Sequence, residues 1–269
     1  MPRGPTAYHR PVPATPSTMT EDYLKVIWKA EEWPGDDGEV VGITTNEIAA
    51  QLGVGASTVS GNLRKLARDG WLHHEPYRPV ALTDAGRDLA LRMVRRHRLI
   101  ETYLVERLGY GWDEVHDEAE VLEHAVSDRL LARFDDELGH PTADPHGDPI
   151  PAVDGTVVRP EARRLGDVPE GGCGPVVRVS DDDPELLRYL GELGLRVGAH
   201  VRVGTRRAYA DSVQVEVDPV PTDAASEGSG GVPGDGRVTT VDLAGRAAAS
   251  VWTGTDAHGH DVVPPPALR

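Results

Sequence analysis

The chain has 269 residues, a formal net charge of −16 and a single cysteine. At roughly 150 residues per domain, this length predicts two domains or three small ones. The lone Cys173 excludes an internal disulfide framework and any multi-cysteine zinc or iron–sulfur site. No stretch reaches the ~18 apolar residues of a membrane span, and the proline-containing N-terminus lacks the apolar core of a signal peptide. We therefore expect a cytoplasmic protein with no membrane partner.

The acidic balance argues against a nucleic-acid partner when the chain is taken as a whole. The charge is unevenly distributed, however. Residues 1–100 carry 13 Lys and Arg against 12 Asp and Glu, whereas the remaining 169 residues carry 15 against 32. Because basic side chains gather between residues 64 and 98, the N-terminal part remains a candidate for binding nucleic acid.

The first third of the chain carries the pattern of a winged helix-turn-helix. Apolar residues at three- and four-residue spacing predict a first helix from about Thr20. The capping-box pair Thr44 and Glu47 opens a short helix, and a second helix follows over about residues 57–69. Short apolar runs on either side of a turn at 75–79 predict a two-stranded wing.

In this arrangement the N-terminal residues of the second helix enter the major groove. They are small and polar, which suits base edges and phosphates, and basic side chains follow one or two turns later. A helical hairpin that serves packing alone is the alternative, but the wing and the local basic charge favour DNA binding. The predicted DNA-contacting residues are Thr45, Asn46, Ser57, Thr58, Ser60, Gly61, Asn62, Arg64, Lys65, Arg68 and Arg78.

After the wing, the pattern predicts helices over about 83–108 and 113–138, followed by a Pro/Gly/Asp-rich loop. Short alternating runs after residue 175, interrupted by a helix over 184–193, predict a small β-barrel. The expected fold class is mainly α with a small β part. The predicted division is a disordered arm (1–18), a winged helix-turn-helix domain (19–83), a helical domain (84–151), a linker (152–174), a barrel-like domain (175–253) and a flexible tail (254–269).

The two long helices carry an unusual concentration of histidine and glutamate: His97, Glu101, His116, Glu120, Glu123 and His124. The first two are one helical turn apart, and the other four follow one stripe at relative positions 0, 4, 7 and 8. Burying carboxylates beside imidazoles is costly unless a cation compensates them, so the pattern predicts a metal site. An exposed, salt-bridged surface is the alternative.

Oxygen and imidazole ligands without sulfur favour Mn²⁺ or Fe²⁺, although Zn²⁺, Co²⁺ or Ni²⁺ can bind as tightly in vitro. A di-metal enzyme is the rival class. Di-iron bundles need a Glu-x-x-His repeat on two helices, and neither Glu101 nor Glu120 has a histidine three residues later. The sequence also lacks a hydrolase nucleophile motif and a phosphate-binding glycine loop. We therefore expect neither enzyme activity nor a small-molecule substrate.

The chain resembles the diphtheria-toxin-repressor family of metal-dependent transcriptional regulators, and its manganese-responsive branch in particular. The resemblance covers about residues 18–155 in family order, through residues 20–24, 57–60, 96–99, 115–120, Glu123, His124 and 147–151. It implies that the helical domain dimerises and that the C-terminal domain is an SH3-like (FeoA-like) β-barrel.

The resemblance also implies two metal sites. Iron-responsive members carry Met and Cys at the positions of Asp22 and Glu120, which agrees with a preference for Mn²⁺ here. Lys25 stands where some manganese regulators carry a further glutamate, which favours two separated sites. The implied primary ligands are Asp22, Glu120, Glu123 and His124; the implied ancillary ligands are His97, Glu101 and His116, with Asp183 and Glu185 as the expected acidic pair from the third domain.

The expected function is a homodimeric, Mn²⁺-activated repressor of metal-uptake genes that binds a palindromic operator in double-stranded DNA. The metal would tie the first helix to the dimer body and place two recognition helices one DNA turn, ~34 Å, apart. An iron-dependent regulator of the same family and a metal-independent winged-helix regulator are the alternatives.

Overall fold

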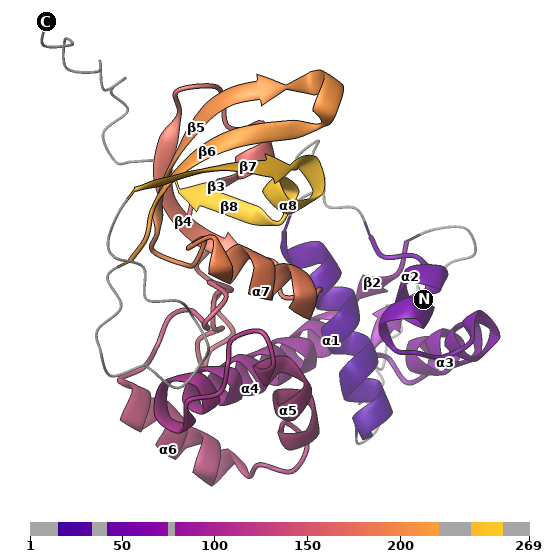
Figure 1. Ribbon diagram of the computed structural model, residues 1–269. Helices are drawn as coiled ribbons and strands as arrows, with labels where there is room; N and C mark the ends of the chain where they lie inside the picture. Colours follow the sequence, from indigo (N-terminus) through magenta and orange to yellow (C-terminus); the bar gives the residue numbers. More distant parts are fainter. Residues whose placement is uncertain (1–15, 34–41, 75–78, 221–237, 255–269) are drawn as a thin grey trace, which may run out of the picture. The chain divides into compact units, whose positions relative to one another are not determined.

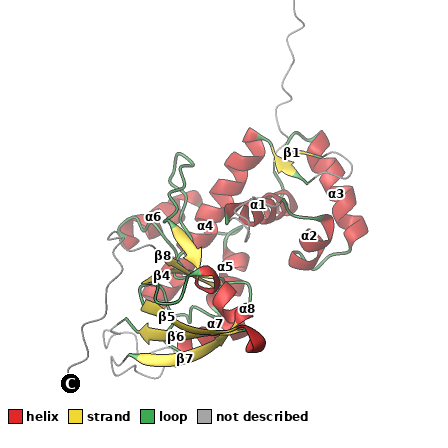
Figure 2. Cartoon of the chain, turned by 90° about the horizontal axis from the view of Figure 1, so that it is seen from above, coloured by secondary structure: helices red, strands yellow, loops and turns green. Residues whose placement is uncertain are grey.

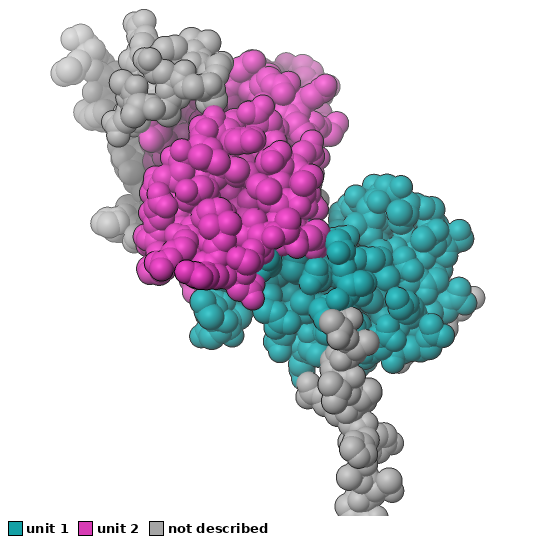
Figure 3. All heavy atoms as spheres, turned by 90° about the horizontal axis from the view of Figure 1, so that it is seen from below, with its two compact units in different colours: residues 1–96, 151–156 teal, residues 97–150, 157–269 magenta. Residues whose placement is uncertain are grey.

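The structure is a computed structural model that describes residues 16–33, 42–74, 79–220 and 238–254. The chain forms two compact units, which consist of residues 1–96 with 151–156 and of residues 97–150 with 157–269 (Figure 3). Arg78, residues 221–237 of the predicted barrel-like domain, and nearly all of the predicted arm and tail lie outside the described residues.

The first unit begins with α1 (Thr18–Glu32), the helix that the apolar spacing predicts (Figure 1). Ser17 caps this helix, because its Oγ accepts a hydrogen bond from the backbone N of Thr20 at 3.3 Å. The inward face of α1 buries the predicted apolar stripe, which comprises Tyr23, Leu24, Ile27 and Trp28.

The helix-turn-helix consists of α2 (Thr45–Gln51) and α3 (Ala56–Arg68). The predicted capping box is present: Thr44 Oγ1 accepts from Glu47 N at 3.3 Å, and Thr44 N donates to Glu47 Oε2 at 2.7 Å. In the turn between the helices Gly53 has a φ of +63°, which residues with a side chain rarely adopt. Helix α3 packs inward through fully buried Val59, Leu63 and Leu66 and leaves its opposite face exposed.

The predicted wing is confirmed, since β1 (Leu72–His73) pairs antiparallel with β2 (Ala81–Leu82) (Figure 2). Helix α4 (Asp84–Leu108) follows at once. A Cβ at Gly86 would lie only 1.9 Å from the carbonyl oxygen of Trp71, so glycine permits the close approach of α4 to the wing.

In the second unit, the C-terminal part of α4 packs with α5 (Val115–Leu122) and α6 (Asp128–Leu138). The single helix expected over 113–138 is therefore two helices. The break is stabilised by Ser127, whose Oγ accepts from Leu130 N at 3.3 Å and so begins a new helix. The buried residues of this part are Leu99, Ile100, Leu104, Val115, Ala119, Val126, Leu131 and Ile150.

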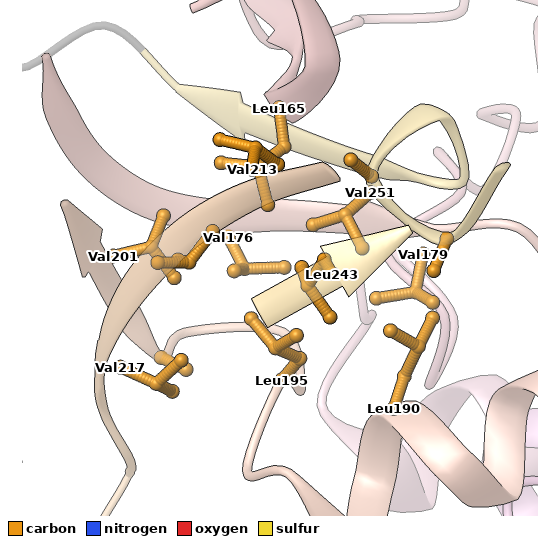
Figure 4. Close-up of a cluster of buried hydrophobic side chains, with 14 of the residues drawn as sticks. Leu165, Val176, Val179, Leu190, Leu195, Val201, Val213, Val217, Leu243 and Val251 are labelled. Carbon is orange, nitrogen blue, oxygen red and sulfur yellow. The ribbon is translucent and has the colours of Figure 1, made fainter. Parts of the chain in front are cut away.

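The C-terminal part of the second unit is a six-stranded antiparallel sheet in the order β3-β8-β4-β5-β6-β7 (Figure 1). Side chains of the sheet and of the helix at residues 184–192 form an apolar core that includes Val176, Leu190, Val213 and Leu243 (Figure 4). The strands are β3 (Ala162–Arg164), β4 (Cys173–Val179), β5 (His200–Arg207), β6 (Ser212–Asp218), β7 (Thr239–Ala244) and β8 (Val251–Gly254), accompanied by α7 (Pro184–Glu192), α8 (Gly245–Ala249) and the short 3₁₀ helices η1 (Leu165–Asp167) and η2 (Ala208–Ala210).

The sheet domain begins earlier than the sequence suggests. Strand β3 pairs with β8, and Leu165 is fully buried in the core, although both lie in the range expected to be a linker. Alternation of apolar residues is absent from a three-residue strand of sequence Ala-Arg-Arg, which is why the pattern gave no sign of it.

The loop at residues 140–150 lies against β4 of this sheet. His146 accepts through its carbonyl from Val179 N at 2.9 Å. Gly147 has a φ of +89°, and a Cβ there would lie 2.0 Å from the carbonyl oxygen of Val177. A glycine at this position thus allows the loop to reach the strand, and the loop carries Asp144, His146 and Asp148 into the interior.

Candidate metal centre and nucleic-acid interface

Histidine and glutamate side chains of α4 and α5 meet in the second unit. His97 and Glu101 lie one turn apart on α4, and His116 and Glu120 lie one turn apart on α5. His97 Nε2 is 2.9 Å from Glu101 Oε1 and 3.2 Å from His116 Nδ1. Glu120 Oε1 is 3.6 Å from His116 Nε2. The structure therefore brings together four residues that the spacing marks as metal ligands.

His97 lies between two buried carboxylates. Its Nδ1 is 2.7 Å from Glu123 Oε2, its Nε2 is 2.9 Å from Glu101 Oε1, and its side chain is 4% exposed. Each ring nitrogen can donate a hydrogen bond to the carboxylate that faces it, or bind a metal ion once it has lost its hydrogen. His97 thereby connects Glu123, expected in the primary site, to Glu101, expected in the ancillary site.

Glu101 is fully buried, and its two oxygens differ in their surroundings. Oε1 lies 2.9 Å from His97 and 3.2 Å from His116, whereas Oε2 has no hydrogen-bond partner among the described residues. Burial alone would raise the pKa of Glu101, but the charge of His97 and hydrogen bonds with His116 and His97 hold this pKa well below its usual range. The carboxylate is therefore ionised at neutral pH.

The C-terminal sheet domain adds a carboxylate to this cluster through Asp181. Asp181 is buried, and its Oδ2 lies 3.8 Å from His116 Nδ1. The expected acidic pair lies elsewhere: Asp183 caps α7 by accepting from the backbone N of Leu186 at 3.2 Å, and Glu185 is exposed in the first turn of that helix.

Sequence reasoning missed Asp181, although one signal was available. Proline is favoured at the first position of a helix, so Pro184 marks the residue before it as the N-cap. Asp183 also pairs with Arg246 at 2.8 Å. The carboxylate of Asp183 therefore contacts α7 and α8, whereas Asp181, two residues earlier, lies beside His116.

The remaining primary-site candidates lie in two different units. Glu123, at the C-terminal end of α5, is fully buried, and His124 Nε2 lies 3.4 Å from Glu123 Oε1. Asp22 lies half-buried in the first turns of α1, in the first unit.

A buried network of charges adjoins the cluster. Arg178 on β4 pairs with Asp148 through Nε–Oδ1 at 2.6 Å and Nη2–Oδ2 at 3.4 Å. Arg98 on α4 lies 3.5 Å from Asp144 Oδ2 and 3.8 Å from Asp148 Oδ1. Burial raises the pKa of Asp148, but Arg178 and Arg98 outweigh this effect and lower it. Burial and the charge of Asp148 raise the pKa of Asp144 to about 7.

Within the second unit, three sets of side chains could each hold a metal ion. Their ligand atoms lie within 4.8 Å of one another in every set, and no described set contains sulfur. The sets are His97 with His116 and Glu120, Glu101 with His116 and Asp181, and Glu101 with Asp144 and His146.

The exposed face of α3 carries most of the predicted DNA contacts. Ser57, Thr58, Gly61, Arg64, Lys65 and Arg68 are exposed on it, Ser60 is half-buried, and α2 adds exposed Asn46 and half-buried Thr45. Asn62 differs from these residues, because its Nδ2 donates to the hydroxyl of Tyr23 on α1 at 2.9 Å. Its amide therefore serves the packing of the helix-turn-helix.

Comparison with known proteins identifies each part of the chain. Residues 16–80 match the iron-dependent repressor N-terminal DNA-binding domain, and residues 83–152 match the iron-dependent repressor metal-binding and dimerisation domain. Residues 163–221 match the FeoA domain. No helix among the described residues is long and apolar enough to cross a membrane.

Similar proteins cover between 70% and 88% of the chain. The iron-dependent repressor IdeR of Mycobacterium leprae is 34% identical over 201 residues, which are 70% of this chain and 85% of IdeR. The structure of a manganese-dependent transcriptional repressor in complex with manganese is 48% identical, covers 88% of this chain and 99% of its own, and has a TM-score of 0.76. The structure of ScaR with bound Zn²⁺ is 33% identical, with 88% and 99% coverage and a TM-score of 0.68.

These matches follow the order of the folded parts described above: a winged helix-turn-helix, a helical domain with clustered metal-ligand side chains, and an SH3-like sheet domain. The chain therefore belongs to the diphtheria-toxin-repressor family of metal-dependent transcriptional repressors, which bind DNA, form dimers and are not enzymes.

Proposed function

We propose that this repressor is activated by Mn²⁺ and represses genes of metal uptake from a palindromic operator. The donor set carries the proposal: the candidate ligands among the described residues are carboxylate oxygens and imidazole nitrogens, a set that suits Mn²⁺ better than softer ions. The 48% identity to a repressor described as manganese-dependent supports the same metal. Fe²⁺ is the alternative, because IdeR is an iron-dependent repressor.

We propose that Asp22, Glu120, Glu123 and His124 form the primary site. Three of them lie on or just after α5, whereas Asp22 lies on α1 beneath the recognition helix, to which Tyr23 is hydrogen-bonded. A cation shared by these residues would fix the winged helix-turn-helix relative to the helical dimerisation domain. In the dimer it would thereby set the two recognition helices ~34 Å apart. Without the cation, repulsion between the carboxylates of Asp22, Glu120 and Glu123 would favour states in which the recognition helices have a different spacing.

For the ancillary site we propose His97, Glu101 and His116 with Asp181. Asp181 replaces Asp183 and Glu185 because its buried carboxylate lies 3.8 Å from His116, whereas Asp183 caps α7. The buried oxygen Glu101 Oε2, which lacks a hydrogen-bond partner among the described residues, fits a metal-ligand role. This site would join the C-terminal domain to the helical core.

The test is a DNA-binding titration of the full chain on a palindromic promoter fragment, in which fluorescence anisotropy of the labelled DNA reports binding. We expect tight binding with Mn²⁺, weaker activation by Fe²⁺ under anaerobic conditions, and no specific binding with a chelator. Tighter activation by Fe²⁺ would assign iron, and equal binding with and without chelator would leave a metal-independent winged-helix regulator. The same proposal places the repressor in the cytoplasm, because its operator DNA lies there.

The site assignment is tested separately. Glu123→Ala removes a fully buried carboxylate and should abolish the response of DNA binding to Mn²⁺, with the dimer intact by light scattering. Asp117→Ala, at an exposed acidic residue of the same helix, is the matched control and should respond as the unmodified chain does. If Glu123→Ala still bound DNA only with Mn²⁺, Glu123 would not belong to the activating site.

A further inference from the structure

Trp112, in the loop between α4 and α5, packs into the core of the C-terminal sheet domain. The residue is 5% exposed and belongs to the same apolar cluster as Leu187, Leu190 and Leu195, which lie on α7 and just after it. Among the described residues, Trp112 is the only member of this cluster that precedes Leu165. A buried aromatic side chain removes about 150–250 Å² of surface from water, so this indole is a substantial contact between the helical part and the sheet domain.

Further contacts fix the indole against α7. A Cβ at Gly191 would lie 3.2 Å from Trp112 Nε1, so glycine permits the ring to approach the helix closely. The guanidinium carbon of Arg196 lies over the ring, 4.8 Å from its centroid, in the geometry of a cation–π contact. Beside the indole, Arg188 Nε lies 3.1 Å from Asp113 Oδ2. These contacts involve apolar, aromatic and guanidinium groups, and they therefore require no bound metal.

The two segments that meet at Trp112 each carry one proposed ligand of the ancillary site. Val115 N donates to the carbonyl of Gly111 at 3.1 Å, which closes the turn that contains Trp112 and leads into α5. His116 is the second residue of that helix. On the sheet domain, α7 begins three residues after Asp181. The packing of the indole against α7 therefore holds the segment that carries Asp181 near the start of α5.

Electrostatic repulsion opposes this arrangement when no cation is bound. Ligand atoms of Glu101, His116 and Asp181 lie within 4.8 Å of one another, and both carboxylate residues are buried. Two ionised carboxylates at such a separation repel each other strongly in the interior of a protein. The sheet domain would therefore move away from α4 and α5 unless other contacts held it in place.

We propose that Trp112 is a positioning residue, which anchors the sheet domain to the α4–α5 loop in the metal-free chain and so holds Asp181 beside His116. The ancillary site is then largely assembled before the cation binds. Because the cation does not have to order the domain, its affinity is higher. The proposal rests on the proposed function only for the assignment of Asp181 and His116 as ligands, and the anchoring is independent of that assignment.

Small-angle X-ray scattering of the metal-free full chain tests the anchoring. We expect Trp112→Ala to increase the radius of gyration, because the sheet domain is released from the loop. Forward scattering in the same measurement verifies that the dimer is intact. Tyr110→Ala is the matched control, since Tyr110 lies in the same loop but packs against the helical core; it should keep the radius of the unmodified chain. An unchanged radius in Trp112→Ala would overturn the proposal.

A double-mutant cycle tests whether Trp112 acts through Asp181. In calorimetric titration with Mn²⁺, Trp112→Ala should weaken binding at the ancillary site by at least about tenfold, as does the loss of a group that orients a metal ligand. The same substitution in an Asp181→Ala chain should cause little further loss, because the ligand that it positions is absent. Trp112→Phe, which keeps an apolar ring, should restore most of the affinity. Equal losses from Trp112→Ala in both backgrounds would refute the positioning role.

A variant on the other side of the contact serves if Trp112→Ala fails to fold by circular dichroism. Gly191→Leu places a side chain against the indole, and leucine favours a helix more than glycine does, so α7 should remain formed. It should increase the radius of gyration, whereas Glu192→Leu, at an exposed position of the same helix, should not. No difference between these two variants would overturn the anchoring.

The measurements also separate this proposal from the proposed function. If Asp181→Ala leaves the affinity for Mn²⁺ unaltered, the assignment of the ancillary site fails. The anchoring by Trp112 is then decided by the scattering of the metal-free chain alone.

Discussion

Arg178 on β4 and Asp148 in the loop at residues 140–150 form a two-point ion pair, at 2.6 Å and 3.4 Å, in which both side chains are at most 8% exposed. A guanidinium matches a carboxylate in this fork geometry better than an ammonium does. The pair joins the helical core to the C-terminal domain, and its removal from one side leaves a buried charge.

We therefore expect Arg178→Met to destabilise the second unit by about 3 kcal/mol, since breaking a buried pair strands the remaining carboxylate. Denaturant unfolding followed by tryptophan fluorescence measures this change. Arg188→Met is the control, because Arg188 pairs with Asp113 at 3.1 Å while its side chain is 59% exposed; it should cost at most about 1 kcal/mol. Equal effects of the two variants would contradict the importance of burial.

Gly147→Ala should separate the loop from β4. The residue has a φ of +89°, and an added Cβ would meet the carbonyl oxygen of Val177 at 2.0 Å. We expect a loss of unfolding free energy of about 3 kcal/mol. Gly109→Ala isolates the backbone strain, because Gly109 has a φ of +74° with nothing within 4 Å of an added Cβ; it should cost about 1 kcal/mol. A smaller loss in Gly147→Ala than in Gly109→Ala would refute the close approach.

Asp181→Ala and Asp183→Ala should differ in kind. We expect Asp181→Ala to lower the affinity for Mn²⁺ in calorimetric titration, because its carboxylate lies beside His116. Asp183→Ala should leave that affinity unchanged and lower the stability by about 1 kcal/mol through loss of the N-cap of α7. The reverse pattern would restore Asp183 as the ligand.

Lys65→Ala should weaken DNA binding to the same extent on specific and unspecific fragments. Lys65 is exposed on α3 behind the N-terminal residues of the helix, where we expect it to contact a phosphate. The slope of log affinity against log salt should fall by about 0.9 for that contact. Arg133→Ala, at an exposed arginine of α6, should leave the slope unaltered.

Thr44→Ala should destabilise the first unit by about 1 kcal/mol at pH 7 through loss of the N-cap. Hydrogen bonds with Thr44 lower the pKa of Glu47 below its usual value of 4.5. A lowered acid pKa contributes stability that is present above pH 4.5 and is lost as the pH falls through the folded-state pKa. The melting-temperature difference between the unmodified chain and Thr44→Ala should therefore narrow below about pH 4. A gap that widened in acid would contradict this role of Glu47.

The helices of the first unit could be predicted closely because their signals are local. The capping-box pair Thr44 and Glu47 opens α2 as predicted, and the apolar stripe of α1 is buried as its spacing predicts. The break between α5 and α6 was not foreseen. The Glu120-to-His124 stripe continues the helical period across it, and a cap such as Ser127 is common inside helices as well as at their starts.

The clustering of His97, Glu101, His116 and Glu120 followed from their spacing on two adjacent helices. Asp144, His146 and Asp181 did not, because a loop and a strand end bring them in from distant parts of the sequence. No period relates such residues to the helices, and only the tertiary contact of the loop with β4 places them. Asn62 was predicted to contact DNA from its position on the recognition helix. The periodicity of the sequence could not show that the hydroxyl of Tyr23 on α1 accepts a hydrogen bond from its amide.

The hydrogen bond from Asn62 to Tyr23 has a consequence for signal transfer. Tyr23 follows Asp22 directly on α1, and its hydroxyl accepts from the middle of α3 at 2.9 Å. A cation that restrains Asp22 would therefore also restrain the recognition helix, because the adjacent residue Tyr23 is hydrogen-bonded to it. Through this hydrogen bond a small rotation of α1 would be transmitted to α3. Tyr23→Phe would remove the hydrogen bond and leave every proposed metal ligand in place.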